Sequence, residues 1–250
     1  MNDPIKHHFI PQFILRNFVN SDDQLFYWNI GNKKLENRNT KSVYMAKNLY
    51  RDEENHPTNP AVIEQKFAML EAKIAQLFQE KILDKNPITI TRTDNELLRK
   101  FLYLLTFRSE TRKKQYIEAN FDDFTKAHLN QYVKDGDYVD LWLREIEMII
   151  DNERYFEIID NKNISWTIKT DFINHLDSYY MTFVTSRGQD FIISDVYPTA
   201  EVFPLGINNA NLYPHYIYPL TPSLALILNH IAFKTDPPMD KLSRMMVMHS

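Results

Sequence analysis

The sequence predicts an α+β protein with a mixed N-terminal lobe, a helical middle and a β-rich C-terminal lobe. Apolar residues recur at helical spacing through roughly residues 61–157. No proline interrupts positions 88–197, which favours continuous helix packing. The last third combines β-branched and aromatic runs with several prolines, a pattern typical of short strands and loops. We expect a single domain over residues 1–250, with sub-lobes at about 1–58, 59–160 and 161–250.

The N-terminal lobe opens on an unusual stretch, His7-His8-Phe9-Ile10-Pro11-Gln12-Phe13-Ile14-Leu15-Arg16-Asn17-Phe18. Proline suits the first turn of a helix, so we expect a short helix to begin at Pro11. The side chains expected to face a core are Phe13, Ile14 and Phe18. His7 and His8 would then lie at the N-terminal end of this helix, where anions bind favourably and where imidazoles titrate near neutral pH.

A hairpin and a loop complete this lobe. The run Gln24–Ile30 predicts a strand, and Gly31-Asn32 is a turn dipeptide of hairpin character. Thr40–Tyr50 is expected to be extended or irregular. Residues 51–60 are polar and contain two prolines, which indicates a loop.

Residues 61–83 predict the first long helix, which would start after Asn59-Pro60. Its expected buried face consists of Ile63, Phe67, Leu70, Ile74, Leu77 and Phe78. Glu64 and Glu71 are seven residues apart, so they share a stripe beside this face, about 10 Å apart along the axis.

A second helix is predicted from the capping box Thr93-x-x-Glu96. Its buried stripe is expected to contain Leu97, Phe101, Leu104 and Leu105. The same stripe continues into Arg108 and Arg112. We therefore expect both guanidinium groups to approach the core or a cleft.

The remaining elements are predicted from the same rules. Phe121–Val133 and Tyr138–Phe156 read as helices separated by Asp135-Gly136-Asp137. Extended segments are expected at Ile164–Lys169, Tyr179–Thr185, Phe191–Ser194, Leu212–Tyr218 and Leu224–Asn229. Ser194-Asp195 would end the third of them.

Composition excludes several classes of protein and site. The chain has no cysteine, so any metal would be held by His, Asp or Glu. Its four glycines form neither a P-loop nor a dinucleotide fingerprint. A net charge of −4 argues against a broad nucleic-acid-binding surface while permitting a local basic patch. No signal region or membrane-spanning run is present, so we expect a cytoplasmic protein without membrane contact.

Five motifs follow one another along the chain. They are the His7-His8…Pro11-Gln12 stretch, the helix bearing Glu64 and Glu71, Phe107-Arg108 with Arg112, Phe191-Ile192-Ile193-Ser194-Asp195, and Pro219-Leu220-Thr221-Pro222. In these motifs the chain resembles an uncharacterised bacterial family, one of the domains of unknown function. The resemblance covers almost the whole chain and implies its organisation rather than a mechanism. Pro198 stands one place later than the family pattern implies.

The polar residues of these motifs suggest a metal site. His8, Glu64 and Asp195 are ligand types suited to Mg²⁺, Mn²⁺ or Zn²⁺, so a divalent metal is a compatible cofactor. Such a metal could activate water for phosphodiester hydrolysis while Arg108 or Arg112 clamps the phosphate. The competing explanation is that each Glu–Arg pair is an ordinary ion pair between helices, which is the commoner case for any single pair.

Three other chemistries fit the spacing poorly. An HNH-type nuclease needs a second His close to the first pair, whereas the next one is His56. A HEPN-like ribonuclease needs an Arg at a defined distance before its His, and His128 lacks one. Ser194-Asp195 has no G-x-S-x-G elbow, and an Asp at a strand end is more often a turn former.

The leading hypothesis is an intracellular, nuclease-like hydrolase, with a toxin or phage-defence role as the context that fits such a family. His8, Glu64, Arg108 and Asp195 would be catalytic and meet in one cleft. The expected substrate-binding residues are His7, Gln12, Arg112 and Ser194. Nucleic acid at a local site would be the partner.

The alternative is a non-catalytic sensor or protein-interaction module whose polar cluster is a structural network. Under that interpretation His8→Ala would sharply lower the melting temperature. Under the enzyme hypothesis only activity would vanish.

Overall fold

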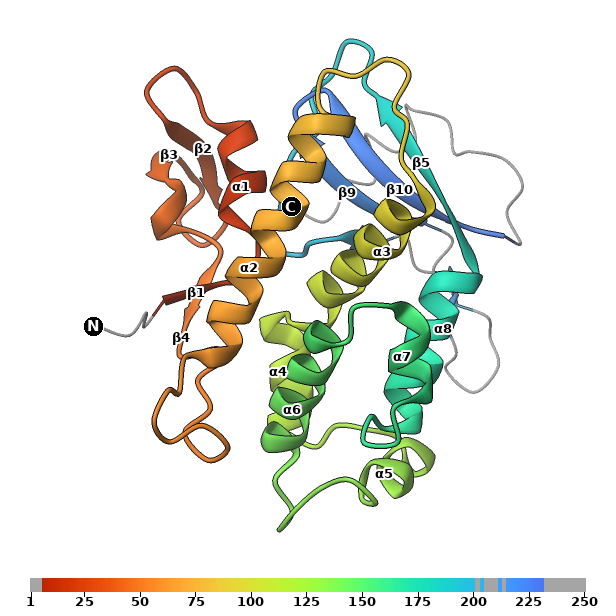
Figure 1. Cartoon of the computed structure of the whole chain (residues 1–250). Coiled ribbons are helices and arrows are strands. Elements are labelled where there is room, and N and C mark those ends of the chain that lie inside the picture. Colours follow the sequence, from red (N-terminus) through yellow and green to blue (C-terminus); the bar gives the residue numbers. More distant parts are fainter. Residues whose placement is uncertain (1–5, 201–202, 205–210, 213–214, 232–250) are drawn as a thin grey trace. The chain divides into compact units, whose positions relative to one another are not determined.

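The computed structural model describes residues 6–200, 203–204, 211–212 and 215–231 (Figure 1). The chain separates into two compact units, Met1–Phe9 with Met45–His175 and Ile10–Tyr44 with Leu176–Ser250. Each unit therefore combines segments that are not contiguous in the sequence. The α+β class is confirmed. The single domain with three sub-lobes stays a prediction, and each unit is described by itself.

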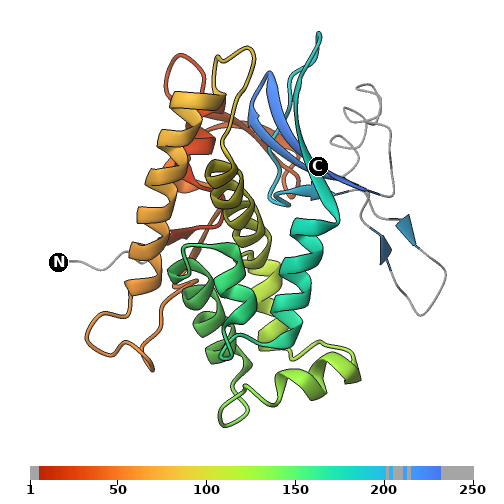
Figure 2. The same ribbon diagram turned by 45° about the vertical axis from the view of Figure 1, so that its right-hand side comes forward.

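The first unit is mainly helical. Its long helices α2 (Val62–Leu77), α3 (Arg92–Phe107) and α6 (Tyr138–Asp151) pack against one another (Figure 2). The shorter helices are α4 (Glu110–Ile117), α5 (Asp123–Leu129), α7 (Tyr155–Asp160) and α8 (Trp166–Asp177), the last of which ends in the second unit. A π-helical turn, η3 (Phe78–Ile82), continues α2. All six side chains expected on the buried face of this first long helix are buried.

The start of α3 differs from the prediction. The capping box is formed by Thr91 and Asp94, two residues earlier than expected. The Asp94 N–H donates to the Thr91 hydroxyl at 3.2 Å, and the Thr91 N–H donates to the Asp94 carboxylate at 2.8 Å. Thr91 has the extended backbone that an N-cap requires, whereas Thr93 already lies inside the first turn. The predicted Thr93–Glu96 box is therefore wrong.

A two-stranded sheet completes the first unit. Strand β1 (Lys6–His8) pairs antiparallel with β4 (Met45–Lys47), which places His7 opposite Ala46. The two histidines thus lie on a strand. Their position at the N-terminus of the following helix stays a prediction, because that helix belongs to the second unit. Pro11 is the N-cap and has an extended ψ of 136°, so the helix begins only after it.

The second unit contains an antiparallel sheet of strand order β5-β10-β9-β6. Its strands are β5 (Tyr179–Thr185), β6 (Thr199–Ala200), β9 (His215–Thr221) and β10 (Leu224–His230). One face of this sheet carries a core cluster of Phe191, Ile217, Ala225 and Ile227. A separate pair joins β7 (Phe203–Pro204) to β8 (Asn211–Leu212).

The N-terminal part of the second unit contains α1 (Gln12–Leu15), η1 (Arg16–Phe18) and η2 (Thr40–Ser42). As predicted, β2 (Gln24–Asn29) forms a hairpin with β3 (Lys34–Asn39). Ile14 is buried as expected, whereas Phe13 and Phe18 are only half-buried.

Two predicted strands are wrong. Ile164–Lys169 lies largely in α8, because the Ser165 hydroxyl accepts from the Ile168 N–H at the start of that helix, and Ile168 and Phe172 bury one helical face at a spacing of four. Phe191–Ser194 forms no regular strand. The Phe191 N–H donates to the Pro222 carbonyl, and a proline has no N–H to return the bond.

Three other predicted elements differ in their bounds. The helix expected over Tyr138–Phe156 ends at Asp151 as α6, and α7 begins at Tyr155. The helix expected over Phe121–Val133 is shorter, as α5. The strand expected over Leu212–Tyr218 lies at β9, with residues 213–214 outside the described part. Within the described residues no helix is both long and apolar enough to cross a membrane.

Candidate functional site

His7 is buried in the first unit and oriented by Tyr50. The Tyr50 N–H donates to His7 Nδ1 at 2.9 Å, and the two rings are stacked with centroids 5.6 Å apart. An imidazole nitrogen that accepts a hydrogen bond carries no proton, so the neutral ring must carry its proton on Nε2. Successive side chains of a strand point to opposite faces, so His7 rather than His8 contacts Tyr50.

Tyr50 links this histidine to the end of α3. Its hydroxyl donates to the carbonyl of Arg108 at 2.8 Å, and its ring packs against Phe67 and Trp142. Complete burial raises the pKa of the Tyr50 phenol well above its ordinary value. The phenol is therefore a fixed hydrogen-bond donor.

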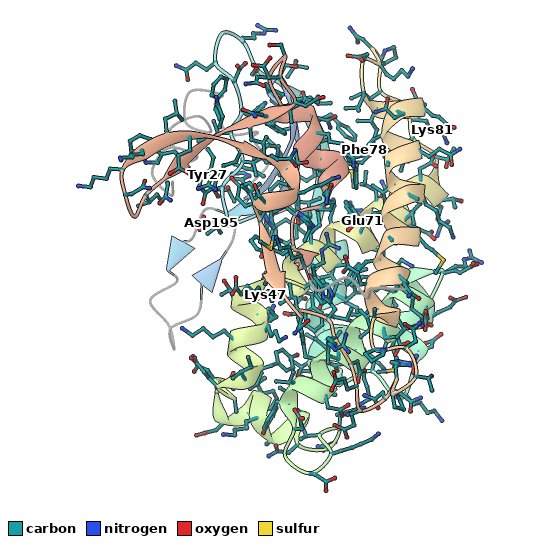
Figure 3. All side chains as sticks on the ribbon, turned by 90° about the vertical axis from the view of Figure 1, so that its left-hand side faces the viewer. Tyr27, Lys47, Glu71, Phe78, Lys81 and Asp195 are labelled. Carbon is teal, nitrogen blue, oxygen red and sulfur yellow. The ribbon has the colours of Figure 1, made fainter. Side chains whose placement is uncertain are left out.

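Arg108 is the most unusual side chain of the unit, because it is charged and only 1% exposed. Its Nη1 donates to Glu71 Oε1 at 2.7 Å, and its guanidinium lies 4.5 Å from the centroid of the Phe67 ring. Glu71 lies midway along α2, as Figure 3 shows. This contact is an ion pair between two helices, as the competing explanation for the Glu–Arg pairs describes.

Two donors of Arg108 have no partner in the described part of the chain. Nε and Nη2 are both buried and make no hydrogen bond there. These two N–H groups form one edge of the planar guanidinium, the edge that binds two oxygens of a carboxylate or phosphate side by side. A buried donor without a partner costs about 1–3 kcal/mol, so a ligand oxyanion at this edge would remove a penalty.

Glu64 supplies a titratable carboxyl in the same place. Burial raises its pKa to about 7, which the positive charge of Arg108 opposes and the negative charge of Glu71 reinforces. Glu71 rather than Glu64 forms the ion pair with Arg108. We call His7, Tyr50, Glu64, Glu71 and Arg108 the Arg108 cluster.

The other predicted site residues of the first unit, Arg112 and His8, do not belong to the Arg108 cluster. Arg112 is in α4, which begins at a new cap, Ser109, so the two arginines do not share one continuous helix. Its Nη1 donates to Gln115 and its Nη2 donates to Asp171 at 3.4 Å. His8 lies on β1 and is half-buried.

Three predicted site residues belong to the second unit. Gln12 begins α1 and accepts a long hydrogen bond from Arg16, and the Ser194 hydroxyl donates to the Val196 carbonyl at 2.8 Å. Asp195 follows in the same loop. Burial raises the pKa of Tyr44 to about 12, and the negative charge of Asp195 adds a smaller contribution. The meeting of Asp195 with His8, Glu64 and Arg108 stays a prediction, because it spans both units.

Residues 6–242 match the model of the family described as "Protein of unknown function (DUF4238)". The chain belongs to this family. DUF4238 thus covers both units, in line with the resemblance found along almost the whole sequence. No curated protein and no solved structure matches the chain.

Among the residues that the structure describes, no three His, Asp or Glu side chains are grouped so that they could hold a metal ion. The proposed ligands His8, Glu64 and Asp195 are divided between the units, so this metal set also stays a prediction.

Tyr50 is the site residue that the sequence did not reveal. It follows a short strand and precedes a polar loop, so no periodicity distinguishes it. Its partners His7 and Arg108 are 43 and 58 positions away. The only local signal is a large aromatic residue just before a polar loop, and that signal is common.

Proposed function

We propose that this chain is a nuclease-like phosphodiester hydrolase in which Arg108 binds the phosphate. The observation that supports the proposal most strongly is the buried guanidinium edge formed by Nε and Nη2. Glu71 already neutralises the arginine from the Nη1 side and fixes its plane. A tetrahedral phosphodiester offers two oxygens at the spacing that this edge recognises.

Glu64 is the proposed general base or acid. A carboxyl with a pKa of about 7 has the proton affinity that acid–base catalysis needs at neutral pH. His7, with its proton on Nε2, is a donor fixed by Tyr50. His8 and Asp195 complete the proposed catalytic set. A divalent metal held by His8, Glu64 and Asp195 would make the reaction metal-dependent.

The test compares two glutamates of the same unit whose pKa is raised by burial, the half-buried Glu64 and the fully buried Glu145. Glu64→Gln keeps the shape of the side chain and removes its proton chemistry, so hydrolysis should fall about 10²–10⁴-fold. Glu145→Gln is the matched control, because burial also raises the pKa of Glu145 to about 7 while its hydrogen bonds serve Ser165 and Tyr116. Rates would be measured on bis(p-nitrophenyl) phosphate and on labelled RNA and DNA oligonucleotides, with EDTA or with Mg²⁺ or Mn²⁺.

The pH profile gives a second readout. If ionised Glu64 is the base, the rate should rise with pH through about 7 and level off above it. Equal loss of activity in the Glu64 and Glu145 variants would contradict the assignment of Glu64. The absence of any hydrolysis by wild-type protein under all three metal conditions would contradict the enzyme proposal.

A non-catalytic module is the second candidate, favoured by one observation. Tyr50 joins three segments through its N–H, ring and hydroxyl, which is the connectivity of a structural network. Under this candidate, Glu64→Gln changes no activity, and loss of His7 or Tyr50 contacts lowers the melting temperature.

A further inference from the structure

The β2–β3 hairpin of the second unit presents large apolar side chains on one face. Phe26 and Trp28 are 66% and 54% exposed, and Ile30 and Leu35 are also exposed. The opposite face turns inward, because Leu25 is buried and Tyr27, labelled in Figure 3, packs edge-on against Tyr44. The alternation of a strand therefore separates an anchored face from a free aromatic one.

The register adds an amide to the aromatic face. Asn37 lies opposite Phe26, and Leu35 lies opposite Trp28. Directly opposite residues point to the same face, so the exposed Asn37 stands beside the Phe26 ring. We call Phe26, Trp28, Leu35 and Asn37 the hairpin face.

The same segment is basic within an acidic chain. Residues 24–41 contain four basic residues and one acidic residue, whereas the whole chain carries a net charge of −4. The one acid, Glu36, is paired with Arg38. Among the described residues, Lys33, Lys34 and Lys41 form no ion pair with a carboxylate. Their charge is therefore available to a polyanion.

We propose that this hairpin binds single-stranded nucleic acid, with bases stacked on Phe26 and Trp28 and backbone phosphates near the lysines. Side chains two residues apart on a strand are about 7 Å apart, so each ring can take its own base. Stacking on aromatic rings beside a basic groove is the common mode of single-strand binding. The inference rests on the proposed function for its choice of nucleic acid, and it adds that the substrate is unpaired.

The composition of the hairpin face favours this ligand over two others. A membrane-inserting face would be apolar throughout, whereas the exposed Asn37 of β3 stands beside Phe26 here. The core of a protein–protein interface is usually depleted in lysine, whereas this segment carries Lys33, Lys34 and Lys41. An amide beside a ring is suited to the hydrogen-bonding edge of an unpaired base. Base faces in a duplex are already stacked and unavailable.

Binding is measured by fluorescence anisotropy of the full-length chain with labelled rU₁₂, dT₁₂ and a 20-base-pair duplex. We expect the single strands to bind at least about tenfold more tightly than the duplex, and Phe26→Ala/Trp28→Ala to weaken them at least about tenfold. The matched control is Phe124→Ala/Trp166→Ala, which removes two aromatic side chains that are 60% and 48% exposed in the first unit. The control should bind as wild type does.

A second measurement tests the inference without the double variant, so it holds even if Phe26→Ala/Trp28→Ala misfolds. In Trp166→Phe, the remaining tryptophans are the exposed Trp28 and the buried Trp142, so quenching by dT₁₂ reports on Trp28. Absence of quenching, equal affinity for duplex and single strand, or binding only to phosphatidylserine vesicles would overturn the inference. Hydrolysis of bis(p-nitrophenyl) phosphate tests the proposed function separately, because that substrate needs no stacking platform.

Discussion

Glu145 should make the stability of the first unit depend on pH. This carboxyl is completely buried, accepts a hydrogen bond from the Ser165 N–H at 3.0 Å, and has its pKa raised to about 7 by burial. A folded pKa near 7 against an ordinary value of 4.5 corresponds to about 3 kcal/mol. Because the folded state binds the proton more tightly, unfolding becomes easier as pH rises from about 4.5 to 7.

The substitution Glu145→Gln should remove this dependence. The amide keeps an oxygen for the Ser165 N–H and an NH₂ that can donate to the Tyr116 hydroxyl, so both contacts have a substitute. Between pH 5 and 8, wild-type protein should therefore lose about 2.5 kcal/mol more stability than the variant. The other titrating groups are shared by both proteins and cancel in the difference.

The assay is urea unfolding at pH 5, 6, 7 and 8, followed by far-UV circular dichroism and by tryptophan fluorescence. Trp142 is buried in the same unit and reports on its unfolding. Parallel stability curves for the two proteins would refute the assignment of a raised pKa to Glu145. A steeper curve for the variant would reverse the sign of the effect and refute it as well.

The remaining predictions concern the N-terminal histidines and the cap of α3. His7→Ala should cost about 1–3 kcal/mol, because it leaves the buried Tyr50 N–H without its acceptor, while His8→Ala should change the melting temperature much less. Equal effects in thermal unfolding would refute the placement of His7. Thr91→Ala should cost about 0.5–2 kcal/mol, whereas Thr93→Ala should stay within about 0.5 kcal/mol. If Thr93→Ala destabilised the protein more than Thr91→Ala in urea unfolding, the N-cap would be Thr93 instead.

Elements with strong periodicity could be predicted from the sequence, and elements decided by distant partners could not. Every side chain predicted for the buried face of the first long helix is buried, because a spacing of three and four residues identifies a helical stripe without tertiary information. The strand predicted over Ile164–Lys169 is wrong, because the β-branched residues of this segment favour a strand locally. Glu145, twenty positions upstream of Ser165, supplies the acceptor that helps to start a helix there.

The candidate site shows the same division. Arg108 stood out because an apolar stripe that ends in charge is unusual, and Glu64 stood out as a carboxyl beside the buried face of a helix. The structure places the buried Arg108 and the half-buried Glu64 in one cluster. The His7-His8…Pro11-Gln12 motif is contiguous in the sequence, yet it crosses from one unit to the other between Phe9 and Ile10. A pattern in neighbouring residues therefore could not show which of them share a site.

The buried charge of Arg108 bears most directly on the choice between catalysis and structure. A structural arginine lowers the cost of its own burial when all its donors are bonded, and Glu71 satisfies only the Nη1 side. Replacement by an apolar side chain would then be expected to stabilise the fold, since the unpaired edge contributes only a penalty. Retention of the arginine has a physical reason if the edge binds an oxyanion. The decisive comparison is thus the thermal stability of wild-type protein with and without inorganic phosphate. A rise in melting temperature that Arg108→Lys abolishes supports an anion site, and no rise in wild-type protein supports the structural network.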